Sequence, residues 1–299
     1  MLSDLAFALA AAGETVTVIT SRQLYDAPET VLADRETVKG VEIRRAWTTR
    51  FGRKRLAGRA IDYLTFYVSA AWQLFRSTRR GDIVIAKTDP PMFSVVAAPI
   101  AQLKGAILVN WLQDIFPEVA EALGVGRSKL ARFSHRAMRS LRNYSLRRAE
   151  VNVVLGERMA EHVEAQGIER ARIRIIANWA DGVQLKPVAP KDNPLRQAWG
   201  LSGKFVAGYS GNLGRAHEYA TLLDAMAVLA SDTRRQCPAS PDAGRGGETA
   251  TGQEQEIVWL IIGGGALFET LKEEVARRGF SSVRFEPRSE ERRVGKECA

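Results

Sequence analysis

Residues 204–215, KFVAGYSGNLGR, decide how this chain folds. The β-forming residues at their start predict a buried strand, and a helical pattern follows from Tyr219 to Ala230. The glycines between them would let backbone N–H groups approach an anion at the N-terminus of that helix, and Arg215 could add a charged fork. A diphosphate suits such a turn. A tight strand-to-helix turn that needs glycine only for its backbone angles explains the same residues, so both interpretations stay open.

A second glycine cluster follows the next strand of the same series. Residues 257–263 predict a strand that ends in Gly263, Gly264 and Gly265, and a helix from Leu267 to Arg277 leads into a third strand at 283–285. The carboxyl ends of parallel strands meet at one edge of a sheet, where open α/β sheets bind ligands. Neither cluster has the GxGxxG spacing with a ribose-binding acid about 20 residues on, so a dinucleotide site fits less well.

The chain before this series repeats the same alternation of strands and helices. Continuous β-branched runs are typical of a parallel sheet that is covered on both faces. Residues 1–180 therefore predict a doubly wound α/β domain. We expect its strands at 15–20, 41–47, 82–88, 106–112 and 151–155, and helices at 92–104 and 127–148.

Composition shifts mark the boundaries of the domains. Residues 181–203 are interrupted by Pro187, Pro190 and Pro194, which predict a linker without helices. A second domain is expected at 204–288, with a disordered insertion at 231–256 that is rich in Gly, Pro, Ser and charge. Residues 289–299 break the pattern and are interpreted as a tail of non-native sequence.

The charge of the chain points to anionic partners. Its 299 residues carry a formal net charge of +9, which attracts nucleic acid, anionic lipid or phosphorylated small molecules. The two cysteines have no metal-ligand spacing, so neither a zinc site nor a disulfide scaffold is expected. The apolar run at residues 5–12 lacks the basic leader of a signal peptide, and no run reaches the roughly 18 apolar residues of a membrane span. We expect a cytoplasmic protein.

Two basic segments favour contact with a membrane surface. Residues 50–80 carry eight cationic side chains around the aromatic stretch 63–68, with Asp62 as the one acid. Residues 127–148 place Arg132, Arg136 and Arg139 at helical spacing and contain no acid. Basic residues beside aromatic ones are typical of helices that bind anionic lipid. An ordinary solvated helix face has the same composition.

Several motifs occur in the order found in one enzyme family. They are residues 111–118 (WLQDIFPE), 155–159 (LGERM), 178–181 (NWAD), 209–214 (YSGNLG) and 262–265 (IGGG). Together they resemble family 4 of the retaining glycosyltransferases, in the branch that builds bacterial surface polysaccharides such as colanic acid and O-antigen.

The resemblance implies the GT-B architecture, in which two Rossmann-like domains face each other across a cleft. The first domain would hold a lipid-linked saccharide acceptor and the second a nucleotide sugar, and the sugar would be transferred with retention of configuration. The resemblance implies no metal and no cofactor beyond the nucleotide sugar, because protein groups would stabilise the departing diphosphate. The implied location is the inner face of the cell membrane, and nucleic acid is not an expected partner.

The resemblance also implies roles for particular residues. Asp114 would orient or deprotonate the acceptor hydroxyl, although a turn or helix-cap aspartate looks the same in sequence. The residues expected to bind the donor and its diphosphate are Ser210, Gly211, Asn212, Gly214, Arg215, His217, Gly263 and Gly264.

The sequence departs from the family pattern in three places. Asn212 and His217 occupy positions where many members carry Arg and Lys, and Arg215 is the one permanent cation near them. The first strand of the first domain and the paired-glutamate motif of the second are missing, so we expect a fragment shortened at both ends, which puts its turnover in question. A nucleic-acid-binding protein and a dinucleotide-dependent sugar-nucleotide enzyme are the two alternatives.

Overall fold

A computed structural model describes residues 1–23, 32–51, 56–118, 129–182, 186–214, 217–231 and 256–287. The chain divides into two compact units, Met1–Asp181 and Gly182–Ala299, and each is described here by itself. Most of the expected insertion, residues 232–255, and the whole of the expected tail lie outside the described residues.

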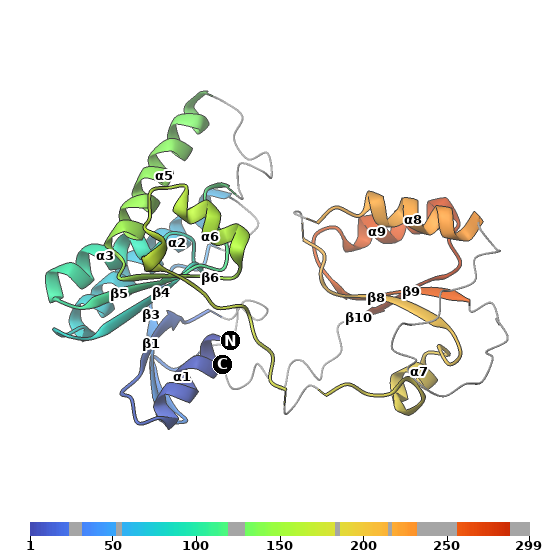
Figure 1. Cartoon of the computed structure of the whole chain (residues 1–299), viewed down its shortest axis with the longest axis horizontal. Coiled ribbons are helices and arrows are strands. Elements are labelled where there is room, and N and C mark those ends of the chain that lie inside the picture. Colours follow the sequence, from blue (N-terminus) through green and yellow to red (C-terminus); the bar gives the residue numbers. More distant parts are fainter. Residues whose placement is uncertain are drawn as a thin grey trace. The chain divides into compact units, whose positions relative to one another are not determined.

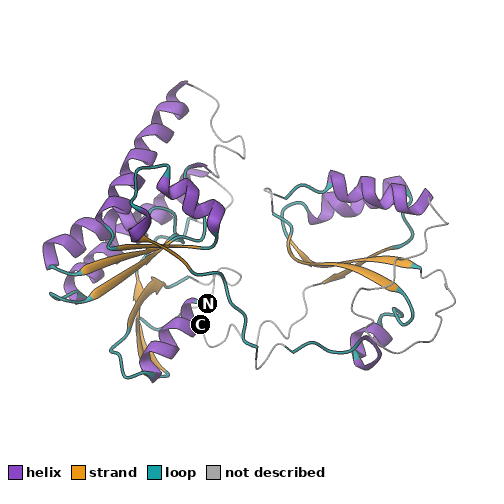
Figure 2. Cartoon of the chain, viewed as in Figure 1, coloured by secondary structure: helices purple, strands orange, loops and turns teal. Residues whose placement is uncertain are grey.

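The first unit is built on a four-stranded parallel sheet of order β4-β5-β6-β7. Its strands are β4 (Ile83–Lys87), β5 (Ile107–Trp111), β6 (Val151–Val154) and β7 (Ile173–Ile175). Four helices lie on the same face of this sheet (Figures 1 and 2). They are α2 (Leu56–Ser77), α3 (Phe93–Lys104), α5 (Lys129–Arg148) and α6 (Glu157–Glu164).

The core of this unit lies between the four helices and that face. Small residues of α3, Ala97, Ala98 and Ala101, pack against Val84 and Leu108 of the sheet and bring the helix close to it. On the opposite face, alternate residues of β4 and β5 are exposed, namely Ile83, Ile85 and Ile107. Among the residues that the structure describes, this opposite face is covered only in part, since Trp111 at the end of β5 is buried and stacks on Trp179 with ring centroids 5.7 Å apart.

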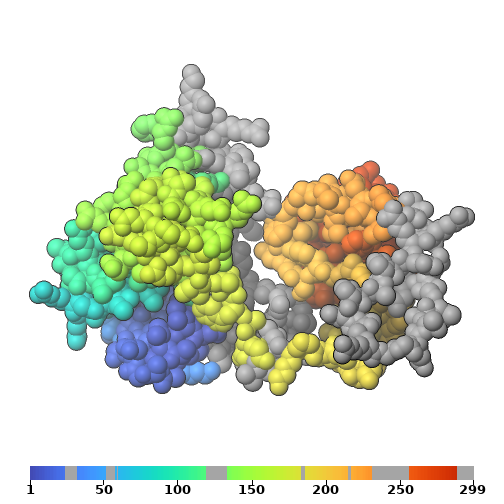
Figure 3. All heavy atoms as spheres, in the orientation of Figure 1, coloured from blue at the N-terminus to red at the C-terminus, as the bar shows by residue number. Residues whose placement is uncertain are grey.

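A second, three-stranded sheet has the order β1-β3-β2. It comprises β1 (Thr17–Ser21), β2 (Arg35–Val38) and β3 (Val41–Ala46), and α1 (Leu2–Ala11) packs against it through Ala6. In the space-filling view these residues, coloured blue, lie at one end of the first unit (Figure 3). The parallel pairing of β1 with β3 agrees with the predicted alternation, whereas the antiparallel strand β2 was not predicted.

The second unit has a parallel sheet of order β10-β9-β8 with helices on both faces. Its strands are β8 (Phe205–Asn212), β9 (Ile257–Gly264) and β10 (Val283–Pro287). On one face, Leu223 and Met226 of α8 (Ala220–Ser231) and Leu271 of α9 (Phe268–Arg278) cover Ile261. On the other face, Trp199 and Leu201 pack on Val258 and Leu260. The short helix α7 (Pro194–Ala198) lies on that side of the sheet (Figure 1).

The expected linker is partly structured. Pro190 and Pro194 were expected to interrupt helices, but Pro190 begins a short 3-10 turn (Pro190–Asp192) and Pro194 begins α7 (Pro194–Ala198). Proline fits the first helical position because its missing N–H has no partner there, and the Asn193 side chain caps the helix by accepting a hydrogen bond from Leu195 N at 3.0 Å. Since Leu201 packs on the sheet, residues 194–201 belong to the second unit.

None of the helices within the described ranges combines the length and the apolar character that crossing a membrane requires.

A buried amide pair joins the two central strands of the first unit to α5. Asn110 Nδ2 donates to Asn152 Oδ1 at 2.9 Å, and Asn152 Nδ2 donates to the Leu146 carbonyl of α5 at 3.0 Å. Both side chains are completely buried. The carbonyl at the end of α5 thereby gains a partner that the helix itself cannot supply.

We predict that Asn152→Ala destabilises the first unit by about 1–3 kcal/mol, because it removes the buried acceptor of one Asn110 N–H and the side-chain donor to the Leu146 carbonyl. Asn110 Nδ2 keeps its 3.3 Å bond to the Ser145 carbonyl. Urea unfolding followed by circular dichroism measures the change. Asn178→Ala, at an exposed position, serves as the control and should cost less than about 0.5 kcal/mol. Equal unfolding midpoints for the two variants would contradict the structural role of the pair.

Candidate functional site

The two glycine stretches lie side by side at the carboxyl edge of the second sheet. Strand β8 continues through Ser210, Gly211 and Asn212, so these residues belong to the strand and not to the turn that was predicted. Gly211 pairs with Gly263, and Asn212 pairs with Gly264. The predicted meeting of the two clusters at one sheet edge is therefore found.

Glycine is required here because the two backbones approach each other closely. Gly263 has a φ of +136°, and a Cβ atom at this position would lie 2.0 Å from the carbonyl oxygen of Gly211. Gly265 has a φ of +126°, and its Cβ would lie 2.5 Å from the carbonyl oxygen of Leu213. At Gly264, by contrast, a Cβ would meet no described atom within 4 Å. Gly264 is thus the member of the cluster that could take a side chain.

Several backbone N–H groups of the described residues after β8 have partners within the chain. Gly214 N donates to Asn212 O at 2.9 Å and to His217 Nδ1 at 3.1 Å. The Glu218 carboxylate accepts hydrogen bonds from Ala220 N and Thr221 N in the first turn of α8. These bonds, that of Thr221 above all, lower the pKa of Glu218. A carboxylate of the chain therefore caps the first turn of α8, and binding of a phosphate at this turn stays a prediction.

The remaining residues of the predicted diphosphate site are only partly described. His217 holds the turn through Gly214, and its ring packs edge-on to Tyr209 with centroids 6.2 Å apart. Arg215 lies outside the described residues. The phosphate contacts of both residues stay predictions.

A cavity of about 360 Å³ opens beside the glycine tract at the carboxyl ends of β9 and β10. Its walls include Gly263 and Gly264, the side chains of Phe268, Glu269 and Lys272 from α9, and Phe285 and Glu286 from β10. The Lys272 ammonium lies 5.2 Å from the ring of Phe268 and 3.5 Å from Glu269. The sequence interpretation missed Lys272, Phe285 and Glu286. Their one sequence signal is their position on the helix and strand that follow the glycine cluster.

In the first unit, Asp114 lies in the loop after β5. Gln113 N donates to Thr88 Oγ1 at 3.1 Å, which joins this loop to the carboxyl end of β4. Asp114 is exposed at the surface, yet partial desolvation of its carboxylate raises its pKa, and the nearby Asp89 raises it further. A hydrogen bond with Thr88 opposes this shift. A carboxylate with a raised pKa at a sheet edge is suited to accept a proton.

Glu118, to which the sequence interpretation gave no role, anchors the other end of the Asp114 loop. Its carboxylate lies 2.9 Å from the buried Arg142, 3.2 Å from Arg139 and 3.6 Å from His162. Burial acts to raise the pKa of Glu118, but hydrogen bonds and the two arginines outweigh burial and hold the pKa below its ordinary value. Arg139, which the sequence predicts on a basic helix face, is thus paired with Glu118.

The described residues bring no three His, Cys, Asp or Glu side chains together in a way that could hold a metal ion.

Comparison with known proteins adds three findings. The family model described as "Glycosyl transferase 4-like domain" matches residues 1–179. A "Probable glycosyltransferase WbjE" of Pseudomonas aeruginosa is 22% identical over 236 residues, which are 79% of this chain and 53% of that protein. The chain therefore spans about half the length of this curated relative.

Two solved structures are similar in fold. Sucrose-phosphate synthase from Thermosynechococcus elongatus has a TM-score of 0.67 at 15% identity, with 96% of this chain and 64% of that chain covered. Anabaena Alr3699/HepE in complex with UDP has a TM-score of 0.52 at 17% identity, with 83% and 56% covered. These likenesses confirm the α/β class and the GT-B fold predicted from the sequence.

The glycine tract gives a prediction with a control at the adjacent residue. We expect Gly263→Ala to destabilise the second unit by about 1–3 kcal/mol or more, because it combines a strained φ with a steric clash against Gly211 O. Gly264→Ala should leave stability within about 0.5 kcal/mol of the wild type, since it has space for a methyl group. Thermal unfolding of both variants measures this difference, and equal losses would contradict the close approach of the two strands.

Proposed function

The chain belongs to the family of glycosyl transferase 4-like domains, and from this we propose that it is a glycosyltransferase that moves a sugar from a nucleotide-sugar donor to a saccharide acceptor. Within the family we place it in the branch that builds surface polysaccharides such as colanic acid and O-antigen. The motif order in the sequence and the likeness to WbjE support this placement.

The observation that carries the proposal is the cavity beside the glycine tract of the second unit. It combines the backbone of Gly263 and Gly264, the aromatic side chains of Phe268 and Phe285, and the cation of Lys272. The lining also carries Glu269 and Glu286, so its charge is mixed, and what favours a nucleotide is an aromatic cavity at the carboxyl edge of a parallel sheet. The complex of the structurally similar HepE with UDP makes a uridine nucleotide the first candidate.

We further propose that transfer proceeds with retention of configuration and without a bound metal. In this scheme Arg215, with Lys272 near the same sheet edge, neutralises the departing diphosphate by preorganised charge. Asp114 receives the proton of the acceptor hydroxyl, a role for which a raised pKa is an advantage.

The test uses a panel of UDP-, GDP- and dTDP-sugars with membrane extract as the acceptor source, and measures sugar transfer and nucleotide release. We expect transfer from at least one donor and a loss of about 10²–10⁴-fold in turnover for Asp114→Asn, with unchanged affinity for the nucleoside diphosphate. In the pH profile of kcat/KM, the apparent pKa on the acid side should lie above the ordinary aspartate value of about 3.9, and this acid-side decrease should be absent in the variant. No transfer from any donor, in a chain that also binds none of the nucleotides, would contradict the proposal.

We also propose that the enzyme works on a lipid-linked acceptor at an anionic membrane, with the exposed stripe of α2 as the contact. This stripe consists of Ile61, Leu64, Val68, Trp72 and Phe75, which follow one another at helical spacing. Leu64, Val68 and Trp72 are 60 to 65% exposed. Large exposed apolar residues in a row mark an interaction surface.

Charge around the stripe favours a lipid surface. The Arg76 guanidinium lies 5.8 Å from the ring of Trp72, and the Lys104 ammonium lies 4.0 Å from that of Phe75. Arg79 and Arg80 follow the helix and are exposed. Each basic residue near an anionic surface contributes about 1 kcal/mol. Of the predicted basic segment, Arg53, Lys54 and Arg55 lie outside the described residues.

The stripe is tested by co-sedimentation with vesicles at low salt. The wild type should bind anionic vesicles more tightly than zwitterionic ones, and salt should weaken this binding. Val68→Glu with Trp72→Glu should abolish binding, while the control Val188→Glu, at an exposed apolar position outside the stripe, should not. A wild type that stays in the supernatant contradicts the membrane contact. The membrane contact is also contradicted if the stripe variant binds vesicles like the wild type but is a monomer where the wild type is a dimer. That result would identify the stripe as an interface between two copies of the chain.

A further inference from the structure

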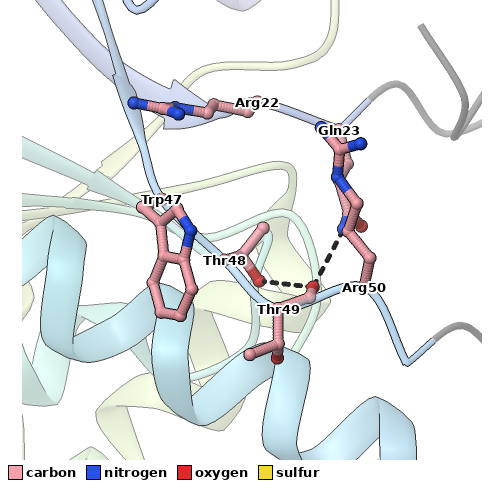
Figure 4. Close-up of a pocket in the computed structure, with 6 residues that line it drawn as sticks. All are labelled: Arg22, Gln23, Trp47, Thr48, Thr49 and Arg50. Atoms are coloured by element: carbon pink, nitrogen blue, oxygen red, sulfur yellow. Dashed lines mark hydrogen bonds between the residues drawn. The ribbon is translucent and has the colours of Figure 1, made fainter. Parts of the chain in front are cut away.

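The first unit contains a second cavity, of about 270 Å³, at the carboxyl ends of β1 and β3. Arg22 and Gln23 follow β1, and Trp47, Thr48, Thr49 and Arg50 follow β3; together they line the cavity (Figure 4). Since β1 and β3 run parallel, both segments leave the sheet at the same edge. In open α/β sheets this edge is where ligands bind.

The lining is positively charged. Arg22 and Arg50 are its two charged members, and no acid is among the six residues. Arg22 pairs at 2.6 Å with Asp34, whose side chain is largely exposed. Its Nε is buried and has no hydrogen-bond partner within the part of the chain that the structure describes. A buried donor without a partner is costly, so an anionic acceptor at this position would stabilise the site.

The other polar groups of the lining hold its wall in place. Gln23 Nε2 donates to the Thr49 carbonyl at 2.9 Å, and Thr49 Oγ1 donates to Asp62 Oδ1 of α2 at 2.7 Å. Thr48 Oγ1 donates to the Asp62 carbonyl at 2.8 Å. A wall that is fixed before a ligand arrives reduces the entropy lost on binding. Arg22, Arg50 and Trp47 are then the side chains left to contact a ligand.

Trp47 gives the cavity an aromatic side. Its side chain is 53% exposed, although its backbone N–H is bound at 2.9 Å to Ser69 Oγ of α2. An exposed indole on a fixed backbone offers an apolar face to the C–H groups of a sugar ring, while the neighbouring arginines match the geometry of phosphate. The volume is close to the lower end of ligand pockets, about 300 Å³, which suits one sugar phosphate and not an oligosaccharide.

We propose that this cavity binds a phosphorylated sugar, with Arg22 and Arg50 as the cations that attract the phosphate and Trp47 as the face for the sugar ring. If the proposed function holds, the cavity is the subsite for the phosphate-linked sugar of the acceptor. It belongs to the first unit, whereas the proposed nucleotide cavity belongs to the second. Among its residues, the sequence interpretation had used Arg50, as one of the charges for a membrane.

Calorimetry with glucose 1-phosphate at fixed ionic strength tests the proposal. Arg50→Gln should weaken binding by about 10-fold to 100-fold, as expected for the loss of a hydrogen bond to a charged group. Arg50→Lys should restore part of the affinity, because it returns the charge without the fork. Trp47→Ala should weaken the affinity for glucose 1-phosphate by about 2-fold to 10-fold and leave the affinity for inorganic phosphate unchanged.

The control is Arg158→Gln, which removes the same charge from a side chain that is 98% exposed on α6. Equal losses for Arg158→Gln and Arg50→Gln would overturn the site and indicate attraction to the net charge alone. Equal affinity for inorganic phosphate and glucose 1-phosphate would overturn the sugar contact. Anionic vesicles that displace inorganic phosphate from a chain that does not bind glucose 1-phosphate would identify lipid phosphate as the occupant and overturn the proposal.

Two further measurements separate this inference from the proposed function. If the chain transfers sugar but does not bind glucose 1-phosphate, only the proposal for this cavity is contradicted. If it binds glucose 1-phosphate through Arg50 but transfers sugar from no donor, the cavity proposal is supported and the proposed function is contradicted. Melting temperatures of all variants verify that each remains folded.

Discussion

A seam of hydrogen bonds between α2 and the segment after β3 determines the geometry of the two surfaces of the first unit that are proposed to bind ligands. Asp62 Oδ1 accepts hydrogen bonds from Thr49 Oγ1 and from Phe51 N, and Thr65 Oγ1 accepts one from Thr49 N at 3.1 Å. Further along the helix, Gln73 Nε2 donates to the Arg45 carbonyl at 3.1 Å. Polar residues every three or four positions thus tie one face of the helix to an extended segment that pairs with no strand among the described residues.

This seam sets the rotation of α2 about its axis. With Asp62 and Thr65 directed at the segment after β3, Phe66 and Ala70 meet the core, and Leu64 and Val68 are left outside. The helix therefore has three faces: one packs in the core, one makes hydrogen bonds to the segment after β3, and the third is the exposed apolar stripe. Since the first two faces hold the helix in place, exposure of the third costs solubility and does not loosen the packing.

Most of the fold could be predicted from the sequence, because apolar runs of strand length alternate with helical patterns along the chain. The missed strands lack that signal. Residues 35–37 of β2 are exposed and two of them are charged, and β7 has only three residues, with Arg174 at its centre. The helix α7 was missed because its prolines suggest interruption, whereas Pro194 stands at the one helical position that favours it. Tertiary packing decides these elements.

The sites were less accessible to prediction. The glycine clusters were placed correctly at one sheet edge, yet the reason for Gly263 is contact with a neighbouring strand, which only the register shows. Arg22 and Arg50 are far apart in the sequence, and Arg50 was counted among the charges for a membrane. The parallel pairing of β1 with β3 brings them to one cavity, and the Asp62 seam connects that cavity to the helix with the apolar stripe. Contacts to a phosphorylated sugar and to a bilayer would then share one rigid support, so that each raises the effective concentration of the other.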